Sequence, residues 1–111
     1  MRSLKKITPE TAIKRACLQY LKARYGRRLW YVNVIGGLGI RPGTPDTLIC
    51  LDGRFVSIEF KNGNKGRVSD YQKQALEEIG AAGGTALIIR SIDECISVFK
   101  NFMPGNQGEL F

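Results

Sequence analysis

The first pattern in the chain is an apolar stripe at helical spacing near the N-terminus. Cys17 and Leu21 belong to this stripe, and polar residues occupy the positions between its members. Thr8 before Pro9 is typical of a helix start, because Thr caps free amide groups and Pro fits the first helical position. The pattern predicts a helix from about residue 8 that ends near Gly26 and lies against the core on one side only.

Three segments with the composition of β-strands come next. They are rich in β-branched and aromatic residues, and the last two are joined by Asp52-Gly53, a strong signal for a two-residue hairpin turn. A loop with four glycines and two prolines separates the first strand from the second. The predicted strands are 29–35, 46–51 and 54–61, and the loop is 36–45.

The remaining elements are a helix, a strand and a helix. Ser69 and Gln72 form the pattern of a capping box, as do Ser91 and Glu94. Between the two helices, residues 85–90 have a continuous apolar middle, which is typical of a buried strand. The predicted order αβββαβ(α) indicates an α/β fold, with a central mixed β-sheet flanked by helices.

The uneven distribution of charge along the chain says more about its binding partner than the net charge does. The chain has 17 Lys and Arg against 10 Asp and Glu, for a net charge of +7. Residues 1–45 hold ten basic residues and one acid, Glu10, whereas residues 46–111 hold seven basic and nine acidic residues. Such asymmetry favours a polyanion such as nucleic acid as the partner. A solvated helix face is an equally good interpretation of the charge alone. An anionic membrane surface is a weaker third interpretation, because the basic segment lacks a large apolar face, and no membrane partner is expected.

Residue types that are absent or scattered exclude several chemistries. The chain has no histidine, which excludes Ser-His-Asp, Cys-His and His-zinc sites. Its three cysteines lie far apart with no CxxC spacing, so neither a disulfide framework nor a zinc knuckle is predicted. With no apolar run near membrane-spanning length and no signal-peptide pattern, a cytoplasmic, reducing location is expected.

The strand 54–61 carries the candidate chemistry. Its side chains alternate between faces, so Glu59 and Lys61 share one face. A two-residue turn at Asp52-Gly53 places Asp46 directly opposite Glu59, where two like charges destabilise the pair. A divalent cation would remove this penalty, and carboxylate and carbonyl oxygens suit Mg²⁺ or Mn²⁺. The alternative is an edge hairpin with a solvated polar face.

These residues resemble a known family. Pro45-Asp46 followed by Glu59-Phe60-Lys61 is similar to the PD-(D/E)xK nuclease motif, and the predicted element order is similar to that superfamily's restriction-endonuclease-like core. With Gly43-Thr44 before this motif, and with Ser69 and Gln72 after it, the chain more narrowly resembles the VRR-NUC (virus-type replication-repair nuclease) domain. The resemblance covers roughly residues 7–100.

The resemblance implies a metal-dependent DNA endonuclease and a role for each matching residue. The implied metal ligands are Asp46, Glu59, the backbone carbonyl of Phe60, and Glu10 from the first helix. Lys61 would position or activate the attacking water, and Gln72 would line the site. Simpler interpretations remain open for two of these residues: Glu10 suits any helix start, and Gln72 suits a capping box.

The substrate and the assembly follow from the resemblance alone. It implies branched DNA, with a Holliday junction preferred, cut by a homodimer in a bacterial or phage-infected cell. The alternatives are a flap or single-strand DNA nuclease and a non-catalytic nucleic-acid-binding module. Trp30 and Tyr31 are expected in the core rather than in stacking contact with bases. The residues expected to contact DNA are Lys14, Arg15, Arg27, Arg28, Arg41, Lys65 and Arg67.

The C-terminal segment suggests a separate partner. We expect the nuclease domain to span residues 1–103 and a flexible tail to span residues 104–111. The tail contains Gln107, Leu110 and Phe111, in a pattern that resembles the peptide with which bacterial replication and repair proteins bind the sliding clamp. Two large apolar side chains on a tail suit a pocket on a partner. Folding of the tail onto the protein's own surface is the alternative.

Overall fold

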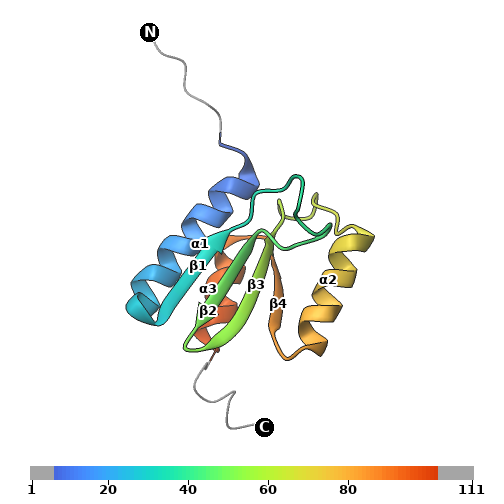
Figure 1. Cartoon of the computed structure of the whole chain (residues 1–111). Helices are drawn as coiled ribbons and strands as arrows, with labels where there is room; N and C mark the ends of the chain where they lie inside the picture. Colours follow the sequence, from blue (N-terminus) through green and yellow to red (C-terminus); the bar gives the residue numbers. More distant parts are fainter. Residues whose placement is uncertain (1–6, 103–111) are drawn as a thin grey trace.

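Four strands form one mixed sheet in the computed structural model, which describes residues 7–102 (Figure 1). The strand order is β1-β2-β3-β4, so β2 and β3 are central and β1 and β4 are the edges. The first three strands are antiparallel neighbours, and β4 runs parallel to β3. The bounds are β1 Leu29–Asn33, β2 Thr47–Leu51, β3 Arg54–Phe60 and β4 Thr85–Ile89.

The hairpin between β2 and β3 has the register that the sequence predicts. Leu51 pairs with Arg54, and Thr47 pairs with Ile58 at the other end. Asp52 and Gly53 have φ values of 52° and 79°, both in the left-handed region that a two-residue hairpin turn requires. The turn chemistry therefore fixes which residues of the two strands face each other, including those at the site.

Three helices flank the sheet. The helices α1 and α3 pack against each other and against the apolar face of β3, whereas α2 lies beside β4 (Figure 1). A single 3₁₀ turn, Gly26–Arg28, links α1 to β1. The bounds are α1 Pro9–Tyr25, α2 Asp70–Ala81 and α3 Ile92–Lys100. The α/β fold class and its element order, αβββαβα, are confirmed.

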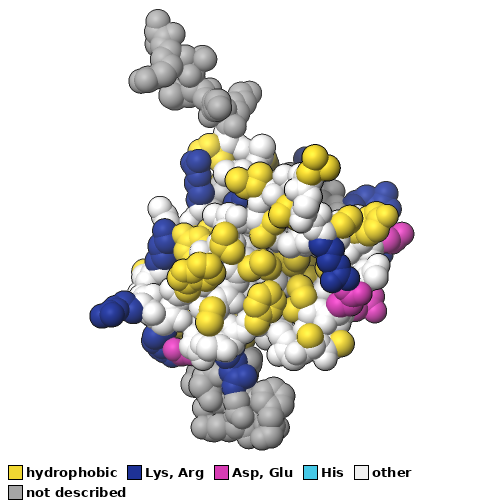
Figure 2. Space-filling view, in the orientation of Figure 1, with side chains coloured by type: hydrophobic (Ala, Val, Ile, Leu, Met, Phe, Trp, Pro, Cys, Tyr) yellow, Lys and Arg dark blue, Asp and Glu magenta, His cyan; other side chains and the backbone are white. Residues whose placement is uncertain are grey.

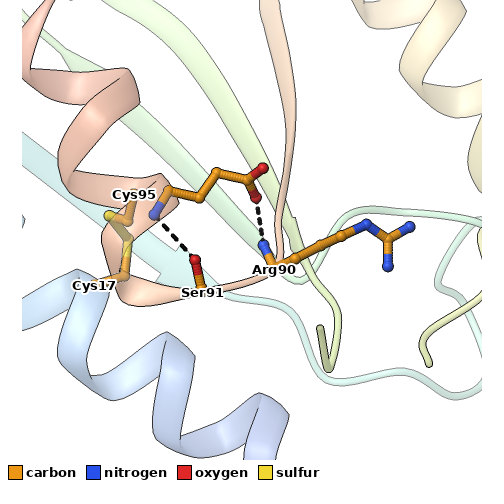
Figure 3. Close-up of a disulfide and its surroundings, with 5 residues drawn as sticks. Cys17, Arg90, Ser91 and Cys95 are labelled. Atoms are coloured by element: carbon orange, nitrogen blue, oxygen red, sulfur yellow. Dashed lines mark hydrogen bonds between the residues drawn. A yellow bond between two sulfur atoms is a disulfide. The ribbon is translucent and has the colours of Figure 1, made fainter. Parts of the chain in front are cut away.

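The helix starts agree with the predicted caps, with one exception. The Thr8 side chain accepts a hydrogen bond from the Thr11 amide at 3.1 Å, and both halves of the Ser69–Gln72 capping box are formed. At α3, Ser91 Oγ accepts from the Glu94 amide at 3.0 Å, but the Glu94 carboxylate accepts from the Arg90 amide at 2.6 Å (Figure 3). The second predicted capping box is therefore only half correct. The Glu94 side chain accepts from the amide of Arg90, the residue before the cap, rather than from the amide of Ser91 itself.

Two burial predictions are wrong, and both concern the edge strands of the sheet, β1 and β4. Trp30 is 67% exposed on the edge strand β1, whereas Tyr31, its neighbour on the opposite face, packs against the core. Hydrophobic side chains gather over the sheet in Figure 2, with Lys and Arg around them. The strand β4 is half-buried rather than buried, because it forms the other edge of the sheet.

A disulfide joins α1 to α3 through the core. It links Cys17 to Cys95, both of which are 0% exposed, across a sequence separation of 78 residues (Figure 3). The prediction that the cysteines form no disulfide is therefore wrong. Their spacing along the chain carries no signal, because only the packing of the two helices brings them together. Cys50 is free and exposed on β2.

Within residues 7–102, no helix combines the length and the apolar character needed to cross a membrane. The boundary predicted between residues 103 and 104 lies outside the described residues, as do Gln107, Leu110 and Phe111.

Candidate active site

The hairpin register brings the candidate carboxylates together at one end of the sheet. Asp46 lies directly before β2, one residue beyond the pair formed by Thr47 and Ile58, and Glu59 occupies the matching position on β3. The Phe60 amide donates to Asp46 Oδ2 at 2.8 Å, and the Asp46 carbonyl accepts from the Val34 amide at 2.7 Å. The Asp46 side chain is therefore held against the backbone of β3 rather than turned to solvent.

Glu59 is a buried carboxylate next to a second negative charge. It is 5% exposed, and burial raises its pKa above the ordinary value, with the nearby charge of Asp46 acting in the same direction. Lys61 opposes both effects, since its Nζ lies 3.4 Å from Glu59 Oε2. A cation bound between the two carboxylates would act in the same direction as Lys61.

Gln72 connects α2 to Glu59 and Lys61. Its Nε2 donates to Glu59 Oε2 at 2.8 Å, and its Oε1 accepts from Lys61 Nζ at 3.1 Å and from the Ser69 amide at 2.9 Å. The structure contains the contacts that both interpretations of Gln72 require. It is the capping partner of Ser69 and also a contact of both charged side chains at the site.

Close packing of Gly43 places the loop before Asp46 against α2. Gly43 has φ +83°, and a Cβ built on it would lie 2.2 Å from the Tyr71 carbonyl oxygen and 2.9 Å from the Gln72 nitrogen. Only a residue without a Cβ fits there. The same loop lines a hollow of about 400 Å³ that includes Asp46. The motif Gly43–Asp46 therefore requires glycine at its first position, because this loop packs directly against the backbone of α2.

Glu10 does not join the two carboxylates. It is exposed in the first turn of α1, and the described residues contain no group of three or more His, Cys, Asp or Glu side chains that could hold a metal. Asp46 and Glu59, with the Phe60 carbonyl between Glu59 and Lys61, form an all-oxygen donor set, which suits Mg²⁺ or Mn²⁺. Among residues 7–102, no third His, Cys, Asp or Glu side chain joins Asp46 and Glu59.

The structure divides the residues expected to contact DNA into two groups. Arg28 forms an ion pair with Asp52, and Arg41 forms one with Glu78, so acids on the protein neutralise both charges. The others form no ion pair within the part of the chain that the structure describes. Lys14 is half-buried, and the exposed ones are Arg15, Arg27, Lys65 and Arg67.

Two basic residues, Lys22 and Arg90, were not among the residues that the sequence pointed to, although one lines a hollow and the other binds the loop after Lys61. Lys22 lies two helical turns after Arg15, and both line a hollow of about 260 Å³ between α1 and β1 that also includes Asn33. Asn33 pairs with Thr47, the residue after Asp46. The helical spacing was the available signal for Lys22. The other missed residue is Arg90, whose contacts span more than twenty residues and leave no trace in the sequence.

Solved structures share this architecture. One, described as a VRR_NUC domain, superposes with a TM-score of 0.74 at 18% identity and covers 87% of this chain and 100% of its own. Another, described as a VRR_NUC domain protein, has a TM-score of 0.68 at 18% identity and covers 90% of this chain and 92% of its own. No protein-family model matches the sequence, and no curated protein matches it either.

The class of fold is therefore that of the restriction-endonuclease-like α/β domains, with a four-stranded mixed sheet between helices. Within that class, the chain has the fold of the VRR_NUC domain, as the sequence resemblance predicts.

Proposed function

We propose that this protein is a nuclease that hydrolyses DNA phosphodiester bonds with Mg²⁺ or Mn²⁺. The observation that carries the proposal is the connected cluster of Asp46, Glu59, Lys61 and Gln72 at one end of the sheet. The shared fold with VRR_NUC domains supports the same assignment. A non-catalytic module would have little reason to bury a carboxylate beside another at the cost that the raised pKa of Glu59 indicates.

Each residue of the cluster has a distinct role in this proposal. A divalent cation held by Asp46, Glu59 and the Phe60 carbonyl would neutralise charge on the phosphate and lower the pKa of a bound water. The Lys61 ammonium orients the attacking water and stabilises negative charge that develops near it. Gln72 holds Glu59 and Lys61 in fixed positions, so neither has to reorganise during the reaction.

The basic side of α1 supplies the binding surface for the DNA backbone. Arg15 and Lys22 line the hollow between α1 and β1, and Lys65 and Arg67 lie in the loop that follows Lys61. Phosphate contacts of this kind are independent of base sequence. Branched DNA as the substrate, with a Holliday junction preferred, and a homodimer as the active species are further parts of the proposal. The sequence resemblance supports them.

The test is cleavage of labelled DNA in a titration of Mg²⁺. The panel contains a four-way junction, a flap, a single strand and a linear duplex, with EDTA as the metal-free reference. We expect metal-dependent cleavage by the wild type and none by Glu59→Ala, whereas Glu77→Ala, which removes an exposed carboxylate of α2, retains full activity. Metal-independent binding of every DNA with no cleavage would support the non-catalytic module instead.

The packing of Gly43 against α2 gives a second expectation. In Gly43→Ala, the new Cβ must push the loop away from Tyr71 and displace Asp46 relative to Gln72. A displacement of about 1 Å in a positioning element costs about 100-fold in rate, and we expect that loss in kcat. Gly39→Ala is the matched control, because Gly39 also has a positive φ of +87° but nothing within 4 Å of an added Cβ. Equal losses in both variants would show that backbone strain alone is responsible.

A further inference from the structure

The loop that follows β3 packs its backbone against the side chain of Lys61. A Cβ built on Gly66 would lie 2.8 Å from Lys61 Cβ and 2.9 Å from Lys61 Cδ, so the glycine backbone covers the apolar stem of the lysine. Lys61 is accordingly only 9% exposed. The stem is enclosed by this loop, while the ammonium at its end contacts Glu59 and Gln72. The position of the loop therefore affects the position of the ammonium.

Arg90 holds that loop in place from the end of β4. Its Nη1 donates to the carbonyl oxygens of Gly63 at 2.7 Å and Gly66 at 2.8 Å, and its own carbonyl accepts from the Gly63 amide at 3.3 Å. The loop is closed internally by the amides of Lys65 and Gly66, which both donate to the Asn62 carbonyl. Arg90 thus supplies the contacts that join this closed loop to the sheet.

Arg90 is itself anchored to two elements. The carbonyl of the preceding residue, Ile89, accepts from the Lys61 amide at 3.0 Å, which continues the parallel pairing of β3 and β4. The Arg90 amide donates to Glu94 on α3 at 2.6 Å, and the side chain extends away from α3 (Figure 3). The guanidinium therefore projects from a fixed backbone position toward a loop that has no regular secondary structure.

We propose that Arg90 is a positioning residue for Lys61. Its guanidinium fixes residues 62–67 against the stem of Lys61 and so keeps the ammonium beside Glu59. This role deepens the proposed nuclease function and rests on it for its effect on rate. Both hydrogen bonds come from one nitrogen atom, so a lysine at this position can in principle form them as well, whereas an apolar side chain of similar length cannot.

The experiment compares Arg90→Met, Arg90→Lys and the control Lys100→Met, which changes an exposed residue at the end of α3, in DNA cleavage with Mg²⁺. We expect kcat to fall by about 100-fold in Arg90→Met with little change in KM, because the lysine is misplaced rather than the DNA released. We expect Arg90→Lys to recover at least part of kcat. Lys100→Met is expected to retain kcat. A rise in KM at unchanged kcat in Arg90→Met would overturn the proposal and make Arg90 a phosphate contact.

A second measurement does not depend on cleavage of DNA. Trypsin cuts after Lys and Arg, and the loop contains Lys65 and Arg67, so limited proteolysis reports how firmly the loop is held. We expect faster cutting at these two sites in Arg90→Met than in the wild type, and an intermediate rate in Arg90→Lys, with the fold of each variant checked by circular dichroism. Equal rates in all three would refute the anchoring. If the wild type does not cleave DNA, the proposed function fails, and proteolysis still decides whether Arg90 anchors the loop.

Discussion

The Asp46→Asn variant is expected to fold and to bind DNA but to cleave it about 1,000-fold more slowly than the wild type, or worse. The asparagine side chain of this variant keeps one oxygen for the Phe60 amide, so the contact that orients the side chain is preserved. What is lost is the negative charge next to Glu59, and with it a proposed cation ligand. A bound cation contributes several kcal/mol of transition-state stabilisation, and each 1.36 kcal/mol is about a factor of ten in rate.

Thermal unfolding with and without Mg²⁺ tests the same assignment independently of cleavage. A ligand that binds only the folded state increases the free energy of unfolding, by about 2.7 kcal/mol at a ligand concentration of roughly 100 times its Kd. The midpoint temperature of unfolding rises as a result. We expect this increase in the wild type and not in Asp46→Asn. Asp52→Asn is the control, because Asp52 is a carboxylate at the opposite end of β2. Normal cleavage by Asp46→Asn in Mg²⁺ would show that the site is assigned to the wrong residues.

The pH dependence of stability should change in the same variant. The folded-state pKa of Glu59 is raised, so the ionised carboxylate is less favourable in the folded protein than in the unfolded chain. In the absence of metal, its ionisation therefore reduces stability as the pH rises from the unfolded-state pKa through the folded-state pKa. Asp46 is the second cause of the raised pKa, after burial. We expect the decrease in stability over this pH interval to be smaller in Asp46→Asn.

Features that depend on neighbouring residues were predictable from the sequence. The Ser69 cap, the turn at Asp52-Gly53 and the register of β2 and β3 follow from local chemistry, and they are confirmed. The same register places Asp46 opposite Glu59 by counting residues outward from the turn. A place for Gln72 at the site was expected only from the family resemblance, because its contact with Glu59 joins a helix to a strand across a loop.

Features that depend on packing between distant elements could not be predicted. The ion pairs of Arg28 and Arg41 join residues 24 and 37 positions apart, and the contacts of Arg90 join the end of β4 to a loop. Trp30 has the composition of a core strand residue, but no helix covers its side of β1. Glu10 has the position of a family ligand in the sequence, yet it lies outside any group of three possible ligands in the described chain.

Reduction of the disulfide between Cys17 and Cys95 is expected to cause a large loss of stability. In the loop-closure model, a cross-link between residues 78 positions apart stabilises the folded state by about 4.5 kcal/mol at 25 °C, because it restricts the unfolded chain. Both sulfurs are buried between α1 and α3, so the reduced protein keeps nearly the same packing and loses mainly the constraint. We expect unfolding at a clearly lower concentration of urea.

Two measurements check this expectation. Thiol titration of the unfolded, unreduced chain should give one free thiol, Cys50, rather than three. Urea unfolding with and without reductant then gives the stability difference, and Cys50→Ser is the control, because it removes the free thiol and leaves the disulfide in place. A titration of three thiols would show that Cys17 and Cys95 are unbonded neighbours in the core. In that case the reducing location expected from the sequence would stand, and reductant would leave the unfolding midpoint unchanged.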